Sequence, residues 1–179
     1  MSLNPSKFLP VIFDAGAIIK SFELQLWDRL VDSYTVIVLK EVIEEAIYYE
    51  DEQAKNQIID LKPYVDGGKI QAVEVTLEEV QSFFKNFDRT YADRMDPGEL
   101  ASLTYLNKKE SSYLIVSGDE IVFKTLGRLG KKEQGISLGK LLVNIGLNKK
   151  LPIQYTEEFR KTCTQKGTID RITGFGKSS

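Results

Sequence analysis

The sequence predicts an α/β fold: a three-layer α/β/α sandwich built around one parallel sheet. Short β-branched runs alternate with helical segments along the whole length, which is the pattern of strands joined by crossover helices. The 179 residues contain no internal repeat, low-complexity stretch or long linker, and their number suits one domain. Residues 1–179 are therefore expected to form a single domain, with a core over about residues 9–155 and a C-terminal helix and loose tail over residues 156–179.

Five apolar runs are the expected strands of the sheet. Residues 9–13 (LPVIF) and 35–39 (TVIVL) come first, and each is followed directly by a charged residue. The later runs are residues 70–75 (IQAVEV), 113–116 (YLIV) and 152–155 (PIQY). Short apolar runs of this length are typical of buried strands in a sheet that helices cover.

The segments between these runs show helical periodicity, with apolar residues three and four positions apart. The expected helices cover residues 22–34, 41–50, 77–87, 100–106, 121–129, 138–145 and 156–163. A more polar helix is expected over residues 52–62, where Pro63 would end it.

The chain has no histidine and a single cysteine, Cys163. This composition excludes Ser-His-Asp and Cys-His catalytic sites, histidine-containing zinc sites and all-cysteine zinc sites. Any bound metal would be a hard cation held by oxygen, such as Mg²⁺ or Mn²⁺.

A cytoplasmic location without a membrane partner is expected. One cysteine allows no internal disulfide, which fits a reducing compartment. No apolar run approaches the roughly 18 residues of a membrane span, and residues 1–7 (MSLNPSK) lack the apolar core of a signal peptide.

The net charge of −2 conceals an uneven distribution. Residues 1–100 contain 10 Lys or Arg and 19 Asp or Glu, whereas residues 101–179 contain 14 and 7. Such asymmetry is an indication of contact with a polyanion, although the same charges can simply solvate helix faces.

Acidic side chains follow the ends of expected strands or open the helices beside them. They are Asp14, Glu41, Glu44, Glu45, Asp96, Glu99, Asp119 and Glu120. Ligands of parallel α/β sheets bind at this edge. Carboxylates gathered there repel one another unless a cation compensates them, and a bound Mg²⁺ or Mn²⁺ can activate water and stabilise a phosphoryl transition state.

Each acid also has a purely structural interpretation. Asp96-Pro97-Gly98-Glu99 fits a capping box, and Asp119 can cap the helix that follows it. The glutamates at residues 41–45 can form a solvated helix face. Asp14 is the hardest to explain structurally, because it directly follows a buried strand and an unpaired buried charge is costly.

The ordered acidic motifs resemble those of the PIN-domain nucleases. The matching segments are VIFDAGA with Asp14, LKEVIEEA with Glu44, DPGELASL with Glu99 and LIVSGDEIVFKTLGRLG with Asp119, followed by GISLGKLL at residues 135–142. They extend over residues 9–142, most of the chain. The resemblance implies a PIN-like sheet with strand order 3-2-1-4-5, in which neighbouring strands 1 and 4 bring Asp14 and Asp119 together.

The resemblance also implies an activity and partners. PIN-domain nucleases are Mg²⁺- or Mn²⁺-dependent enzymes that hydrolyse phosphodiester bonds, usually of RNA. A metal-dependent endoribonuclease acting on single-stranded RNA is therefore expected. Many members are toxins of toxin–antitoxin pairs and many dimerise, so an antitoxin partner and a homodimer are further expectations.

The family's site residues are carried over position by position. Asp14, Glu99 and Asp119 would hold the metal, and Glu44 would support a second metal or orient the attacking water. Supporting roles fall to Ser117, Asp96 and Glu120, and the expected phosphate contacts are Lys108, Lys109, Lys124 and Arg128. Two points stay open: Gly16 stands where members often carry a hydroxyl or amide side chain, and the second acid is Glu41, Glu44 or Glu45, depending on helix register.

The main alternative is a PIN-like domain without catalysis that binds proteins or acts as a scaffold, although acids at four motif positions argue against it. A response-regulator receiver needs an acidic pair after its first strand, where this chain has only Asp14. A P-loop fails as well, because Gly135–Lys140 spaces its glycines too closely.

Overall fold

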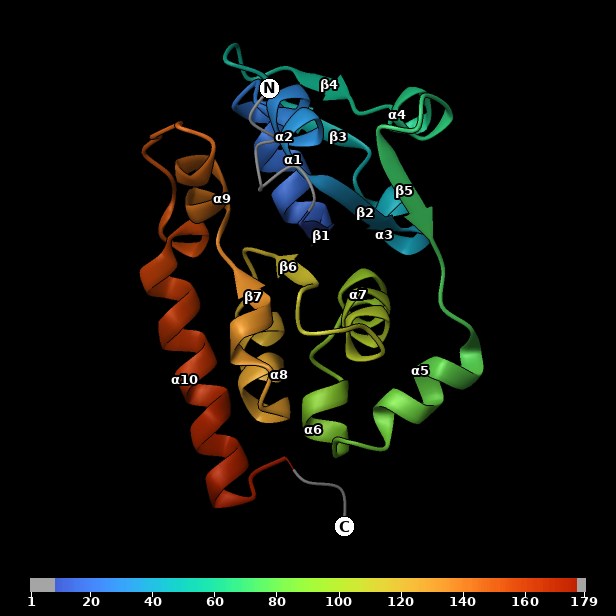
Figure 1. Ribbon diagram of the computed structural model, residues 1–179, viewed down its shortest axis with the longest axis vertical. Coiled ribbons are helices and arrows are strands. Elements are labelled where there is room, and N and C mark those ends of the chain that lie inside the picture. Colours follow the sequence, from blue (N-terminus) through green and yellow to red (C-terminus); the bar gives the residue numbers. More distant parts are fainter. Residues whose placement is uncertain (1–8, 177–179) are drawn as a thin grey trace.

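The computed structural model describes residues 9–176 and shows an α/β fold with a five-stranded parallel sheet and surrounding helices (Figure 1), an arrangement consistent with three layers. The expectation about a signal peptide falls on residues 1–7, which lie outside the described residues. The end of the expected tail, residues 177–179, lies outside them as well. No helix in the described range is long and apolar enough to cross a membrane.

The sheet is made of β1 (Pro10–Phe13), β2 (Thr35–Leu39), β5 (Ile70–Val73), β6 (Leu114–Val116) and β7 (Gly135–Ile136). Their order is β5-β2-β1-β6-β7, and every neighbouring pair is parallel. β1 lies at the centre, with Ile12 paired to Ile37 of β2 on one side and to Ile115 of β6 on the other. All three of these side chains are buried.

This order differs from the expected 3-2-1-4-5 in two respects. Two further strands precede β5 in the chain and form a separate sheet. The run over residues 152–155 is not a strand: it contains the 3₁₀ helix η3 (Ile153–Tyr155), and the edge position of the sheet is taken by β7 instead. A two-residue strand is too short for its alternation to be recognised in a sequence.

A β-hairpin replaces the polar helix expected over residues 52–62. Its strands, β3 (Tyr48–Glu50) and β4 (Asn56–Ile58), are antiparallel. The turn between them places Ala54 at a φ of 57°, and the Asp51 carboxylate accepts two main-chain N–H groups of the turn. Such side-chain bonds to the main chain favour a turn over a helix.

The helices are α1 (Ala15–Glu23), α2 (Trp27–Ser33), α3 (Lys40–Glu45), α4 (Lys62–Asp66), α5 (Leu77–Phe84), α6 (Arg89–Ala92), α7 (Pro97–Asn107), α8 (Glu120–Leu129), α9 (Leu138–Asn144) and α10 (Glu157–Thr173), with a 3₁₀ turn η2 (Lys132–Gln134). The helices expected over residues 77–87, 100–106, 121–129 and 138–145 are confirmed to within a few residues.

The helix expected over residues 22–34 is instead two helices, α1 and α2. α1 begins directly after β1, where Asp14 is its N-cap and accepts the Ala17 N–H. The break between α1 and α2 includes Gln25, whose φ of 57° is incompatible with a continuous right-handed helix.

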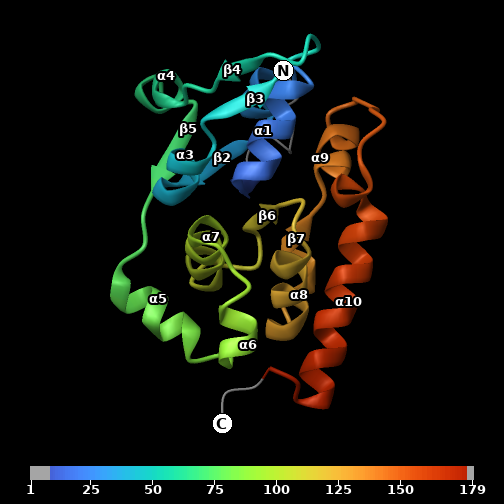
Figure 2. The same cartoon turned by 180° about the vertical axis from the view of Figure 1, so that it is seen from behind.

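The C-terminal helix is longer than residues 156–163, because α10 continues to Thr173. It lies beside α8 in both views (Figures 1 and 2) and packs closely against it. Glycines permit the approach: a Cβ on Gly127 would lie 2.0 Å from the Thr164 carbonyl oxygen, and one on Gly167 would lie 1.8 Å from that of Lys124. The α8–α10 pair is thus a tightly packed unit of the fold.

Candidate functional site

Five carboxylates line one small cavity just beyond the C-terminal ends of β1 and β6. They are Asp14, Glu45, Asp96, Glu99 and Asp119, and Ala15 and Gly16 complete the wall. The cavity volume is about 30 Å³, which is room for an ion or one or two waters but not for a nucleotide. A larger substrate would therefore lie across its mouth.

Asp14 is held by two hydrogen bonds that use both of its carboxylate oxygens. Oδ1 accepts the Ala17 N–H at 2.8 Å, and Oδ2 accepts the Ser117 hydroxyl. The Asp14 N–H also donates to the Val116 carbonyl oxygen at 3.2 Å, which extends the β1–β6 ladder by one bond. The ladder thus places Asp14 beside the turn that follows β6.

Ser117 connects the turns after β1 and β6. Its hydroxyl donates to Asp14 and accepts the Asp119 N–H at 2.9 Å. The side chain of Ser117 is fully buried. Ser117 thus bonds the Asp14 carboxylate directly and also fixes the main chain of Asp119.

The expected capping box at the start of α7 is confirmed. The Glu99 N–H donates to Asp96 Oδ1 at 2.8 Å, and the Asp96 N–H donates to Glu99 Oε2 at 3.0 Å. These bonds do not remove the two residues from the site, since both line the cavity. The capping hydrogen bonds instead fix the two carboxylates where they line the cavity.

Asp119 is the N-cap residue of α8, but its side chain makes no capping hydrogen bond. The structural interpretation considered for its carboxylate is therefore wrong. That carboxylate lines the cavity together with Glu99.

The glutamate that reaches the cavity from α3 is Glu45 and not Glu44. Glu45 lines the cavity and its Oε1 accepts the Gly98 N–H at 3.0 Å, whereas Glu44 does not line the cavity. Glu41 lies one turn earlier on α3, and its Oε2 is buried without a hydrogen-bond partner. The sequence left the choice among these three glutamates open, and the register of α3 decides it.

The pKa values show that the cluster resists being fully ionised. Burial raises the pKa of Asp14 to about 7, and burial also raises the pKa of Glu99 to about 8. Burial and the Asp96 charge raise the pKa of Asp119, and burial and the same charge raise that of Glu45. No lysine or arginine of the described residues forms an ion pair with any of the five carboxylates.

The donor set suits a hard cation, because Mg²⁺ and Mn²⁺ prefer carboxylate oxygens. The arrangement is not yet that of a metal site: over residues 9–176, no group of three or more His, Cys, Asp or Glu stands where it could hold a metal ion. The oxygens line the cavity wall and are engaged by main-chain N–H groups and Ser117. Binding a cation would require the side chains to turn inward.

The residues expected to contact phosphate are engaged elsewhere. Lys108 pairs with Glu79, and Lys109 lies over the rings of Tyr105 and Tyr113. Lys124 pairs with Asp170 at 3.5 Å.

Arg128 is only 9% exposed, and it donates from Nη1 to the Asp170 carbonyl oxygen at 3.4 Å. Its Nε is buried without a partner. The supporting residue Glu120 pairs with Lys166 at 3.0 Å. Neither side chain is among those that line the cavity.

Sequence reasoning missed Tyr155, which packs behind the acidic cavity. Its hydroxyl donates to the Gly16 carbonyl oxygen at 3.2 Å. Burial and the charges of Asp14 and Asp119 raise its pKa to about 12, so the phenol is neutral. No periodic pattern marks it, because the contact joins residues 139 positions apart.

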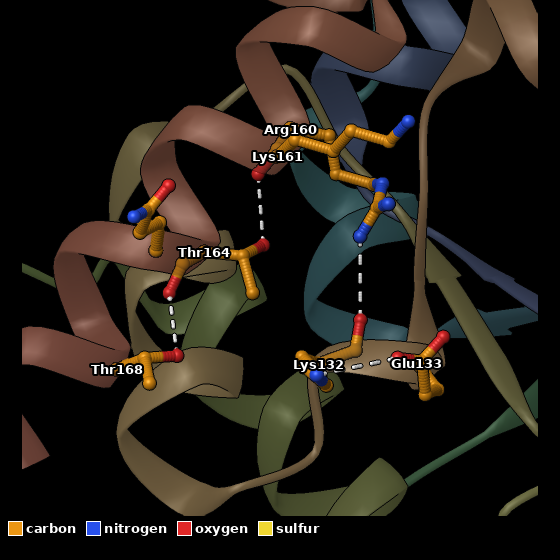
Figure 3. A pocket seen from close by; sticks show the side chains of 7 residues that line it. Lys132, Glu133, Arg160, Lys161, Thr164 and Thr168 are labelled. Carbon is orange, nitrogen blue, oxygen red and sulfur yellow. Dashed lines mark hydrogen bonds and ion pairs between the residues drawn. The ribbon is translucent and has the colours of Figure 1, made fainter.

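A wider cavity of about 420 Å³ lies between η2 and α10, lined by different residues (Figure 3). It contains basic groups, yet Arg160 is already bound to Glu157 and to the Lys132 carbonyl oxygen. None of the five carboxylates of the small cavity lines it.

Comparison of the chain with protein-family models, curated proteins and solved structures finds no match. The functional conclusion accordingly rests on the residues of this chain and on their geometry.

Proposed function

We propose that this protein is a metal-dependent endoribonuclease of the PIN type, which hydrolyses phosphodiester bonds of single-stranded RNA. One observation carries the proposal. Carboxylates from four separate segments line one small cavity at the ligand-binding edge of a parallel sheet, and within residues 9–176 no lysine or arginine forms an ion pair with them.

The electrostatics of this cavity favour a cation as the missing partner. Buried like charges are stable only when protons or cations compensate them, and the raised pKa values of Asp14 and Glu99 express that cost. A divalent cation would displace the protons and leave the carboxylates ionised. Asp14, Glu99 and Asp119 are the proposed ligands, and Glu45, which also lines the cavity, takes the part expected of Glu44.

Each side chain has a stated part in the proposed reaction. When bound, the metal supplies an activated water and stabilises charge on the phosphoryl group. Ser117 orients Asp14, and the capping box orients Glu99. Glu45, which accepts the Gly98 N–H, would hold a water beside the metal.

RNA as the substrate is supported by the motif resemblance, and the small cavity suits a single strand. A 30 Å³ cavity admits no base or sugar, so the substrate would offer only a phosphate to it. A single strand can bring its phosphodiester linkage to such a site without the bulk of a second strand.

The test is cleavage of a mixed-sequence single-stranded RNA in Mn²⁺, in Mg²⁺ and in EDTA. We expect cutting by the wild type with either metal and none in EDTA. Glu99→Gln should lose cutting while keeping its fold, because the amide retains the bond from the Asp96 N–H. Metal-independent cutting, or no cutting by a wild type that binds Mn²⁺, would contradict the proposal.

A further inference from the structure

Tyr155 lies between the two turns that carry the principal carboxylates. The first turn, after β1, runs through Asp14 and Gly16, and Tyr155 donates its hydroxyl to the Gly16 carbonyl oxygen at 3.2 Å. The second turn, after β6, contains Gly118 between Ser117 and Asp119. A Cβ on Gly118 would lie 2.6 Å from Tyr155 Cε1, so the ring lies directly against this turn.

The glycine at position 118 makes the ring contact possible, because a Cβ there would overlap the ring. At position 16 a Cβ would be in ordinary contact with the Tyr155 hydroxyl oxygen, at 3.4 Å. The ring therefore takes the volume that a side chain at position 118 would fill. Lys20 of α1 makes a cation–π contact with the ring, its Nζ lying 5.9 Å from the ring centroid.

Tyr155 is anchored by the secondary structure on both sides of it. It ends η3, where its N–H donates to the Pro152 carbonyl oxygen, and Thr156 then caps α10. α10 is packed closely on α8, and α8 begins directly after Asp119. Tyr155 thus joins the α8–α10 unit to the first turn of α1.

From this geometry we infer that Tyr155 is a positioning residue, which fixes the separation of the Asp14 and Asp119 turns and so sets the cavity for its cation. The effect on the cation rests on the proposed function, whereas the effect on the two turns can be tested without it. Removing the phenol or the ring should loosen these two turns first and the rest of the domain little.

The chain offers a matched control. Tyr34 is also buried, and its hydroxyl also donates to a carbonyl oxygen, that of Leu141, at 2.8 Å. Neither Tyr34 nor Leu141 lines the acidic cavity. Tyr155→Phe therefore deletes a hydroxyl-to-carbonyl hydrogen bond beside the site. Tyr34→Phe deletes one away from it.

The first measurement is amide hydrogen exchange at Ala17 and Asp119, whose N–H groups bind Asp14 and Ser117. Tyr155→Phe should speed exchange at both by about tenfold relative to Ile37 in the centre of the sheet, and Tyr155→Leu should speed it further. Tyr34→Phe should leave that ratio unchanged. Equal acceleration at all three amides in Tyr155→Phe, or no acceleration, would overturn the inference.

The second measurement is Mn²⁺ affinity by calorimetry on the same proteins. We expect an about tenfold weaker affinity for Tyr155→Phe and wild-type affinity for Tyr34→Phe. A wild type that takes up no Mn²⁺ overturns the proposed function, and the exchange ratios still decide the positioning role. Wild-type Mn²⁺ affinity in both Tyr155 variants would overturn that role at the site.

Discussion

Asp14 and Asp119 are connected through one buried hydroxyl. Ser117 donates its hydroxyl hydrogen to Asp14 Oδ2 and accepts the Asp119 N–H on the same oxygen. The two acids are 105 positions apart in the sequence, and the parallel pairing of β1 with β6 brings them together. The β1–β6 pairing thus brings the two turns together, and the Ser117 hydroxyl connects them.

Asp14→Asn should abolish metal-dependent RNA cleavage, by about 100-fold or more, because a charged ligand is lost with almost no change in shape. The amide oxygen can still cap α1, so the fold should persist.

The metal-free Asp14→Asn variant should also melt at a higher temperature than the wild type at pH 8, since a buried charge is removed. Cleavage assays and circular dichroism melts test both parts, and a variant that cuts RNA as fast as wild type would refute the assignment of Asp14.

Glu45→Gln should weaken cleavage by about 10- to 100-fold, whereas Glu44→Gln should leave it unchanged. Glu45 lines the cavity and accepts the Gly98 N–H, and Glu44 is an exposed neighbour on the same helix. The pair is matched in chemistry and position, so each variant controls for the other. The reverse order of effects would mean that α3 is one residue out of register in solution.

The metal-free protein should lose stability as the pH rises from 5 to 8. The folded-state pKa values of Asp14, about 7, and Glu99, about 8, lie above the ordinary values of 3.8 and 4.5. The protonated acids therefore contribute stability that is complete below about pH 4 and is lost as the pH rises through 7 to 8.

Between pH 5 and pH 8 this loss for Asp14 alone is about 3 kcal/mol, or on the order of 10 °C in melting temperature. Thermal melts across this pH range in EDTA measure it, and excess Mn²⁺ should restore the melting temperature at pH 8. A metal-free protein that is equally stable at pH 5 and pH 8 would show that the carboxylates are not buried as described.

Gly167→Ala should destabilise the fold by about 2 kcal/mol or more, because the new methyl group would overlap the Lys124 carbonyl oxygen at the crossing of α8 and α10. Gln165→Ala is the control, since Gln165 is exposed on the same helix. Urea unfolding measures both free energies. Wild-type stability in Gly167→Ala would mean that α10 does not pack on α8.

The part of the site that a sequence can predict is the part set by local pattern. Asp14 follows a buried run directly, and Asp96-Pro97-Gly98-Glu99 is a capping box recognisable from four letters, so both were placed correctly at the ends of their elements. The α/β class was predictable for the same reason, because alternating strands and helices leave a periodic signal.

The rest depended on contacts that no local pattern contains. To choose Glu45 over Glu44, one must know which face α3 turns toward the cavity. That helix has only six residues, too few to show a helical period in the sequence. Tyr155 falls in a run expected to be a strand, whereas its contacts in the fold are with Gly16 and Gly118, far from it in the sequence. Lys124 and Arg128 carry the positive charge that a phosphate contact needs. Both bind Asp170 of α10 instead, because α10 packs on α8.

The most direct test of the central claim, that the acidic cavity takes up a divalent cation, is a calorimetric titration of Mn²⁺ at pH 8 into wild type, Asp14→Asn and Glu44→Gln. We predict saturable binding to the wild type and to Glu44→Gln, with proton release as the carboxylates ionise, and at least about tenfold weaker binding to Asp14→Asn. Equal binding by all three proteins, or no binding by the wild type, would contradict the account.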